Sequence, residues 1–292
     1  MEFVQPASWA EALAAKAANP ESVPIAGGTD VMVELNFDVR RPPALIDLTR
    51  VPGLCDWSAD GGTIRLGAGL TYTRLIAELS GQLPGLAMAA RTVGSPQIRN
   101  RGTIGGNLGA ASPAGDCHPP LLAARAQIEL ASVRGTRTVP ADGFYAGVKR
   151  NALAPDELIA AVLIPAATGP QQFAKIGTRN AMVIAVASFS IGLDPVTQTV
   201  GAGIGSAAPT PRRAQEAEEF LAGALAAQRL WESRGDLPDP VAAGFAARVR
   251  AAAAPIDDVR GSAAYRLHAL AVLARRALTW AWRDYQRGTG AG

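Results

Sequence analysis

Two pairs of adjacent glycines most constrain how this chain can fold. The first lies in Ala26-Gly27-Gly28-Thr29-Asp30, and the second in Thr103-Ile104-Gly105-Gly106-Asn107. Glycine reaches φ > 0 without steric cost and has no Cβ, so each pair predicts a turn whose consecutive backbone N–H groups can approach a phosphate. Two ordinary tight turns are the alternative for either pair alone. Together the two segments favour one dinucleotide held from two sides.

The composition is typical of a globular protein, with 48% hydrophobic and 18% charged residues in 292. That length allows two domains, one of which can contain two sub-domains. The formal net charge is only +3, and Lys and Arg form no dense run. We therefore expect no nucleic-acid partner.

The chain offers no plausible iron–sulfur or structural zinc site and little material for a His-rich metal site. It has two cysteines, Cys55 and Cys117, and two histidines, His118 and His268, without a CxxC motif. The adjacent pair Cys117-His118 gives no ligand geometry by itself, and we interpret it as structural. The N-terminal residues lack the features of a signal peptide, and no apolar run approaches the ~18 residues of a membrane span. We expect a cytoplasmic protein with no transmembrane segment.

The hydrophobic patterns predict an α+β protein in two domains. For residues 1–168, with sub-domains of about 1–55 and 56–168, we predict alternating strands (22–25, 44–48, 63–69, 127–131, 157–165) and helices (8–18, 71–79, 86–93, 119–124). The Pro- and Gly-containing segment 166–170 is the expected boundary. For residues 169–292 we predict a small antiparallel sheet (173–176, 185–193, 199–204) followed by three helices (211–226, 239–253, 262–286). The last helix presents Leu267, Leu270, Leu273 and Leu278 to a core.

Common nucleotide-binding fingerprints are incomplete in this sequence. Gly67-Ala68-Gly69 follows a predicted strand and precedes a helix, but Tyr72 stands at the third glycine position of GxGxxG. Gly201-Ala202-Gly203 fails in the same way, because Ser206 replaces the last glycine. No P-loop motif occurs. A dinucleotide bound by this chain is therefore not held in the Rossmann manner.

The order of the motifs resembles a known family. Residues 97–116 read QIRNRGTIGGNLGAASPAGD, which is similar to the FAD-binding subunit of the xanthine dehydrogenase and carbon monoxide dehydrogenase family of molybdenum hydroxylases. AGGTD resembles the first FAD loop of that family, and residues 173–186, 208–214 and 257–262 resemble signatures of its C-terminal domain. The resemblance covers nearly the whole chain. It implies a two-part α/β FAD-binding domain of the PCMH type, followed by a domain like the C-terminal domain of CO dehydrogenase flavoprotein.

The resemblance also implies residues that bind FAD. The segment from Pro24 to Val31 would wrap the diphosphate, and the segment from Thr103 to Asn107 would close from the other side. Asp116 would accept hydrogen bonds from FAD hydroxyls. Val93 and Ile159 would pack near the flavin, and the charge of Lys175 would favour a reduced, anionic flavin. The alternatives are a loop-capping Asp116, plain core positions for the two apolar residues, and a solvated surface Lys175. The implied set is Pro24, Ile25, Ala26, Gly27, Gly28, Thr29, Asp30, Val31, Val93, Thr103, Ile104, Gly105, Gly106, Asn107, Asp116, Ile159 and Lys175.

The resemblance implies an electron-transfer function and two partners. A large subunit would hold molybdopterin, and a small subunit would hold [2Fe–2S] clusters, in a dimer of heterotrimers. FAD on this chain would pass electrons to NAD+, a quinone, oxygen or another acceptor. Two alternatives stay open: a self-sufficient FAD oxidoreductase of the same fold, and a non-enzymatic interaction subunit. The substrate hydroxylated by the large subunit is not encoded in this chain.

Overall fold

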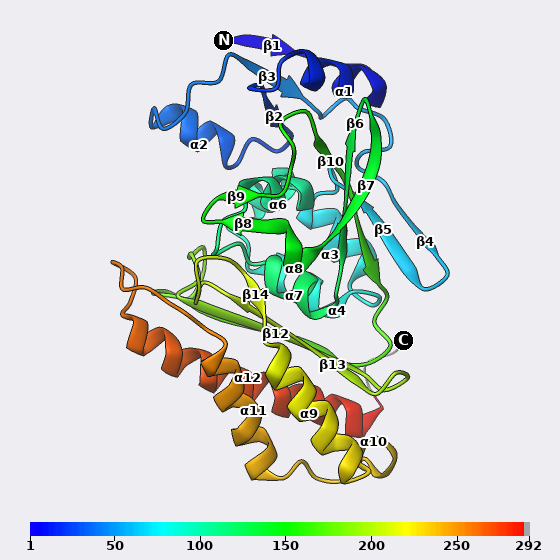
Figure 1. The fold of residues 1–292 in the computed structure, drawn as a ribbon, viewed down its shortest axis with the longest axis vertical. Coiled ribbons are helices and arrows are strands. Elements are labelled where there is room, and N and C mark those ends of the chain that lie inside the picture. The colour runs from blue at the N-terminus through cyan, green and yellow to red at the C-terminus, as the bar shows by residue number, and fades with distance from the viewer. Residues whose placement is uncertain (289–292) are drawn as a thin grey trace.

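The N-terminal part of the computed structural model, which describes residues 1–288, is a three-stranded parallel sheet of order β1-β3-β2. Its strands are β1 (Glu2–Val4), β2 (Val23–Ile25) and β3 (Ala44–Asp47), with helices α1 (Trp9–Ala18) and α2 (Val31–Asn36). The Ser8 side chain caps α1 by accepting from the N–H of Glu11. This layer lies at the top of Figure 1.

The second sheet has five strands in the order β4-β5-β10-β6-β7, all antiparallel. The strands are β4 (Trp57–Asp60), β5 (Thr63–Gly67), β6 (Gln127–Ser132), β7 (Gly135–Pro140) and β10 (Leu158–Pro165). The chain between β5 and β6 forms α3 (Tyr72–Leu79), α4 (Pro84–Arg91), α5 (Pro96–Arg101), α6 (Ile104–Ala110) and α7 (His118–Ala123). Helix α8 (Ala141–Phe144) and the small hairpin of β8 (Tyr145–Gly147) and β9 (Arg150–Asn151) precede β10. One hydrophobic cluster joins these helices to both N-terminal sheets.

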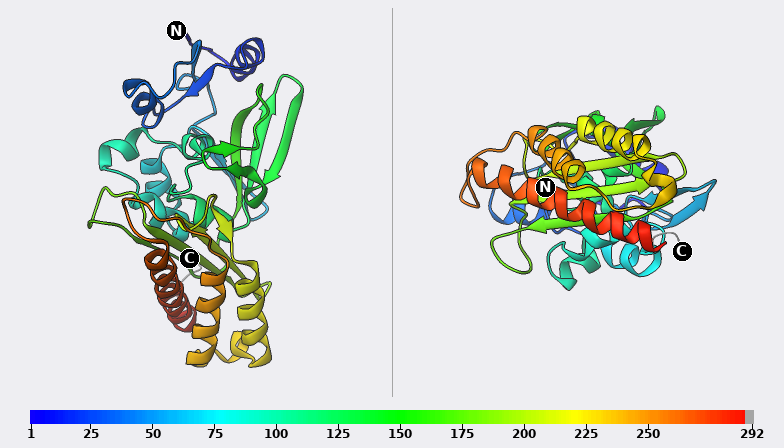
Figure 2. Two further views of the ribbon diagram at one scale, coloured as in Figure 1. Left: turned by 60° about the vertical axis from the view of Figure 1, so that its left-hand side comes forward. Right: turned by 90° about the horizontal axis from the view of Figure 1, so that it is seen from below.

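The third sheet is antiparallel, as predicted, with strands β11 (Gln171–Ile176), β12 (Ala187–Asp194), β13 (Thr199–Gly205) and β14 (Arg212–Arg213). Four helices follow: α9 (Gln215–Ala227), α10 (Leu230–Ser233), α11 (Asp239–Ala251) and α12 (Ala263–Arg287). Figures 1 and 2 show α9, α11 and α12 together on the face of this sheet that points away from the rest of the molecule. They enclose a second hydrophobic cluster with the sheet.

Helix α7 covers the opposite face of the third sheet, because β13 carries glycine at alternate positions there. An ideal Cβ on Gly201 would lie 1.8 Å from the carbonyl oxygen of Ala123, and one on Gly203 would lie 2.0 Å from that of Pro119. Successive side chains of a strand point to opposite faces, so Gly201, Gly203 and Gly205 share the face that meets α7. The incomplete fingerprint at Gly201–Gly205 thus serves close packing between the two halves of the chain.

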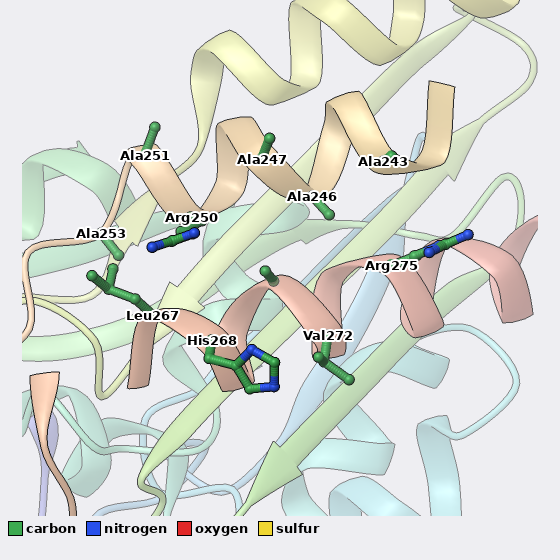
Figure 3. A pocket seen from close by; sticks show the side chains of 11 residues that line it. Ala243, Ala246, Ala247, Arg250, Ala251, Ala253, Leu267, His268, Val272 and Arg275 are labelled. Atoms are coloured by element: carbon green, nitrogen blue, oxygen red, sulfur yellow. The ribbon is translucent and has the colours of Figure 1, made fainter. Parts of the chain in front are cut away.

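One predicted core position differs in the structure. Leu270, Leu273 and Leu278 of α12 are buried as expected, but Leu267 is only half-buried. Leu267 lies at the outer edge of α12 and lines a shallow hollow between α11 and α12, beside Arg250 and His268 (Figure 3). The seam between two helices, rather than the sheet, receives this side chain.

No helix within residues 1–288 is both long enough and apolar enough to cross a membrane.

Candidate functional site

The first glycine segment connects β2 to α2 at the C-terminal edge of the parallel sheet. Gly28 has φ +75°, a conformation that L side chains rarely adopt. Within residues 1–288, the N–H groups of Gly27, Gly28 and Thr29 donate to no acceptor. Backbone N–H groups that are left unpaired require water or a ligand. This segment therefore has the consecutive free donors that the sequence predicted.

The flanking residues of this segment have different environments. Pro24 and Ile25 end β2, and both are half-buried, as are Ala26 and Val31. Asp30 is exposed and precedes α2 without capping it through its side chain. The free donors thus lie on a short connection whose two ends are fixed by a strand and a helix.

The second glycine segment is not an open turn, which corrects the expectation that it exposes consecutive N–H groups. Thr103 is the N-cap of α6, and its Oγ1 accepts from the N–H of Gly106 at 3.0 Å. The N–H groups of Ile104 and Gly105 donate to the carbonyls of Leu70 and Ala68. These partners are more than thirty positions away, so local sequence gave no sign of them.

The glycines of this segment differ in what surrounds them. An ideal Cβ on Gly105 would lie 2.6 Å from both the Cβ and the carbonyl oxygen of Ala68. Gly105 therefore serves packing of α6 against the end of β5. Gly106 is exposed, and apart from its chain neighbours and the backbone of its own helix, the one atom within 4 Å of its ideal Cβ is Oγ1 of Thr103, at 3.0 Å. The surface beside Gly106 is thus open for a ligand.

The fold brings the two segments together. An ideal Cβ on Gly27 would lie 2.0 Å from the carbonyl oxygen of Arg101 and 3.0 Å from the backbone nitrogen of Gly102. Gly102 is the C-cap of α5 and directly precedes Thr103. Only glycine permits this backbone-to-backbone approach. The free N–H groups of the first segment therefore lie next to the start of α6.

Asp116, which follows α6 in the chain, belongs to a buried group of polar side chains with Lys175 and Thr92. Nζ of Lys175 is 2.6 Å from Oδ2 of Asp116, and each of these two side chains is only 8% exposed. Oγ1 of Thr92 donates to the same oxygen at 3.1 Å, while Nζ of Lys175 also donates to the carbonyl of Thr92 at 3.2 Å. Burial raises the pKa of Asp116, and the Lys175 ammonium opposes that rise. Lys175 is thus not a solvated surface residue, and its place near a flavin stays a prediction.

Two buried acceptor oxygens at this site have no donor. Oδ1 of Asn107 and Oδ1 of Asp116 form no hydrogen bond with any residue of the described chain. A buried acceptor left without a donor costs about 1–3 kcal/mol, so such atoms mark a missing ligand or water. A ligand that carries hydroxyl groups would supply both donors.

The two apolar positions expected near a flavin also lie in this region. Ile159 is 8% exposed and stands at a β-bulge of β10, where the pairing with β6 shifts by one residue. Its Cδ1 is 3.9 Å from an ideal Cβ on Gly109 of α6. Val93 is half-buried directly after α4, and its carbonyl accepts from Arg99. Sequence reasoning missed Thr92, because a lone threonine at the end of a helix carries no signal.

Cys117 and His118 are completely buried next to Asp116. The His118 ring faces the Tyr145 hydroxyl, 2.9 Å from Nδ1, and burial lowers the pKa of His118 to about 3. Burial also raises the pKa of the Cys117 thiol, which lies beside the Tyr72 hydroxyl. Burial of both side chains agrees with the structural interpretation, although Nε2 of His118 has no hydrogen-bond partner within residues 1–288.

The hollow of about 730 Å³ between α11 and α12 does not have the features of the region around the glycine segments. It is lined mostly by alanines, together with Arg250, His268 and Arg275 (Figure 3). It contains none of the unpartnered atoms described above. The candidate site is therefore the region where the two glycine segments, Asn107 and Asp116 converge.

Comparison with known proteins identifies the family to which the chain belongs. Residues 1–167 match a family described as the FAD binding domain in molybdopterin dehydrogenase. The chain belongs to this family. Residues 172–281 match the C-terminal domain of CO dehydrogenase flavoprotein. The chain is an FAD-binding subunit of the molybdenum hydroxylase type, so the predicted family, cofactor and enzyme class are confirmed.

Individual relatives of this FAD-binding family match over almost their full length. The nicotine 6-hydroxylase medium subunit of Paenarthrobacter nicotinovorans is 31% identical, with 95% of this chain and 96% of that protein covered. The xanthine dehydrogenase FAD-binding subunit of Escherichia coli O157:H7 is also 31% identical, over 94% of this chain and 93% of that protein. A solved carbon monoxide dehydrogenase from Hydrogenophaga pseudoflava superposes with a TM-score of 0.88 at 29% identity, covering 97% of each chain.

The residues present fit FAD. FAD has a diphosphate that needs N–H donors, and Gly27, Gly28 and Thr29 offer three that are free. It also has a ribityl chain and a ribose whose hydroxyls can donate, and the oxygens of Asn107 and Asp116 lack donors.

Proposed function

We propose that this chain is the electron-transfer subunit of a molybdenum hydroxylase complex. It takes electrons from [2Fe–2S] clusters in a small partner subunit, and it passes them from FAD to NAD+, a quinone, oxygen or another acceptor. In the same proposal a large subunit carries molybdopterin, and two heterotrimers form a dimer in the cytoplasm. The carrying observation is the set of free N–H groups at Gly27–Thr29, placed beside the start of α6 in a fold shared with medium subunits.

Each part of the site has a task in this proposal. The segment from Pro24 to Val31 wraps the diphosphate, and Thr103 to Asn107 closes from the other side. Asp116 accepts from FAD hydroxyls through Oδ1, and Lys175 lies behind it. Val93 and Ile159 exclude water near the flavin. Bound FAD supplies the redox chemistry, while the protein supplies position, dryness and charge.

The chain's other reactive groups support electron relay rather than independent acid–base catalysis. His118 is fully buried with its pKa lowered to about 3, so its ring stays neutral near pH 7. The Cys117 thiol is equally inaccessible, and burial raises its pKa. A general acid–base pair needs groups that titrate near the working pH and reach a substrate. Neither of these residues meets that requirement.

The Gly106→Val variant tests the FAD site. A side chain there meets little within the protein, apart from Oγ1 of Thr103, but it occupies the open surface assigned to FAD. We expect wild-type protein to be purified with a flavin absorption spectrum and the variant to lose it. Gly223→Val is the matched control, because an ideal Cβ on Gly223 of α9 has no atom within 4 Å. A full flavin spectrum in Gly106→Val protein would contradict the assignment.

Co-purification tests the relay. We expect two further subunits to be purified with the chain, and its flavin to be reduced by the complex's substrate only when they are present. Flavin reduction by substrate in the isolated chain would indicate a self-sufficient oxidoreductase instead. A wild-type chain that stays colourless after incubation with FAD would indicate an interaction subunit.

A further inference from the structure

A buried ion pair joins the C-terminal domain to the FAD-binding domain at the candidate site. Lys175 belongs to β11, which starts the third sheet, whereas Asp116 directly precedes the segment that leads into α7. The two charges are 2.6 Å apart and almost completely excluded from water. An ion pair in such a position is costly to leave half-formed, because either charge alone would be buried without compensation.

The alternation of β11 explains why Lys175 reaches across. Gln171, Phe173 and Lys175 share one face of the strand, and each contacts the FAD-binding domain. Oε1 of Gln171 accepts from the N–H of Gly85, and Phe173 belongs to the N-terminal hydrophobic cluster. Ala174, on the other face, belongs to the C-terminal cluster. Packing of β11 against the FAD-binding domain therefore places Lys175 next to Asp116.

The two oxygens of Asp116 are treated differently. Oδ2 accepts from both Lys175 and Thr92, whereas Oδ1 is buried without a donor. Two donors on one oxygen fix the rotation of the carboxylate. The free oxygen then points in one direction, and its acceptor strength depends on the carboxylate staying charged, since charge-assisted hydrogen bonds are roughly twice as strong as neutral ones.

We propose that Lys175 is a positioning residue that couples FAD binding to docking of the C-terminal domain. It keeps Asp116 ionised and oriented, so that Oδ1 accepts a hydrogen bond from the bound cofactor. The inference rests on the proposed function, because it takes FAD as the ligand. It adds that Lys175 acts on the cofactor through Asp116.

A double-mutant cycle tests this coupling in the full-length chain, or in the complex if the chain is purified only with its partners. The variants are Lys175→Met, Asp116→Asn and both together, with FAD affinity and the Tm of the FAD-free protein measured for each. We expect each single change to weaken FAD binding by about tenfold or more, as for loss of a buried charge pair. The double variant should bind FAD no more weakly than the weaker single variant, because both changes remove one shared interaction.

Two further variants make the result specific. Lys175→Arg keeps the charge and should bind FAD more tightly than Lys175→Met. Arg275→Met removes an exposed cation from the same domain and should bind FAD like wild type. Wild-type affinity in Lys175→Met, additive losses in the double variant, or equal affinities of Lys175→Arg and Lys175→Met would overturn the coupling. A wild-type chain that binds no FAD would instead reject the proposed function itself.

Discussion

Single glycines in this protein serve three separable purposes. Gly28 adopts a positive φ in the first segment, Gly27 and Gly105 permit close backbone approach, and Gly106 faces open surface. Gly203 also permits close backbone approach, because a Cβ at this position would collide with the Pro119 carbonyl. The purpose is set by the surroundings of the residue rather than by the local motif.

Gly203→Ala should destabilise the protein without touching the FAD site. Its Cβ would lie 2.0 Å from the carbonyl oxygen of Pro119, and backbone atoms on both sides resist movement. We expect a loss of about 1–3 kcal/mol in the free energy of unfolding, the usual cost of overpacking. Urea denaturation measures it. Gly223→Ala, in open space on α9, is the control, and an equal effect of both changes would show that α7 yields easily.

The residues also show where sequence reasoning stops. The starts of the helices at Ser8, Thr71 and Ser262 were predicted correctly, and each of these side chains accepts from a backbone N–H three residues ahead. The hydrogen bonds of Gly105 to Ala68, and of Thr92 to Asp116, join distant segments and leave no local pattern. The residue set that binds FAD stays a prediction, although the family is shown.

At the scale of the elements, two arginines hold the turn from Asp258 to Gly261. Arg266 of α12 is 3% exposed and donates to the carbonyls of Val186 and Ser206 and to Oδ1 of Asp258. Asp258 also accepts from the backbone and side chain of Arg260. One buried guanidinium thus holds the start of α12 against the segments flanking β12 and β13.

The pKa of Asp258 makes this brace sensitive to acid. The Arg260 backbone N–H, followed by the Arg266 and Arg260 side chains, lowers that pKa from 3.8 to about 2. A lowered pKa means that the stabilisation is complete above the ordinary value and is lost as pH falls through about 2.

The Asp258→Asn variant tests that dependence. We expect it to be less stable than wild type by about 1–2 kcal/mol at pH 7, since hydrogen bonds to a charged group are lost. The difference should shrink as the pH is lowered from about 4 toward 2. Urea denaturation of both proteins across this range measures it, and a difference that does not vary with pH would refute the assignment.

At the scale of the whole molecule, a second charged network joins the two halves. Glu218 of α9 is 4% exposed and accepts from the backbone N–H of Ala202 and from Arg213. Arg213 also pairs with Asp142 of the FAD-binding domain, and Arg125, at the end of α7, lies 3.7 Å from Glu218. The contact between the FAD-binding domain and the C-terminal domain therefore contains ion pairs at two places, one at Asp116 and one at Glu218.

Glu218→Ala should be strongly destabilising, because it leaves the buried N–H of Ala202 without its acceptor and removes the closer of the two carboxylates that pair with Arg213. We expect a loss on the order of 3 kcal/mol in the free energy of unfolding. Glu219→Ala, at the exposed neighbouring position of the same helix, should change stability by less than about 0.5 kcal/mol. Similar values for the two variants would mean that Arg213 and Ala202 find other partners.

The overall architecture was more predictable than its connections. Hydrophobic alternation located the antiparallel third sheet, and helical periodicity located α9, α11 and α12. The domain boundary near residue 168 stays a prediction. The pairing order of the second sheet and the approach of α7 to β13 depend on contacts between distant segments, which one sequence does not display.

The two faces of β11 have a consequence for exchanging parts between relatives. Because Phe173 enters one core and Ala174 the other, deleting a single residue between Pro170 and Phe173 would reverse both faces. A chimera that joins this FAD-binding domain to a relative's C-terminal domain must therefore keep the linker length and the side chains at 171, 173 and 175. Strand β11 therefore fits only a domain pair whose two cores match its two faces.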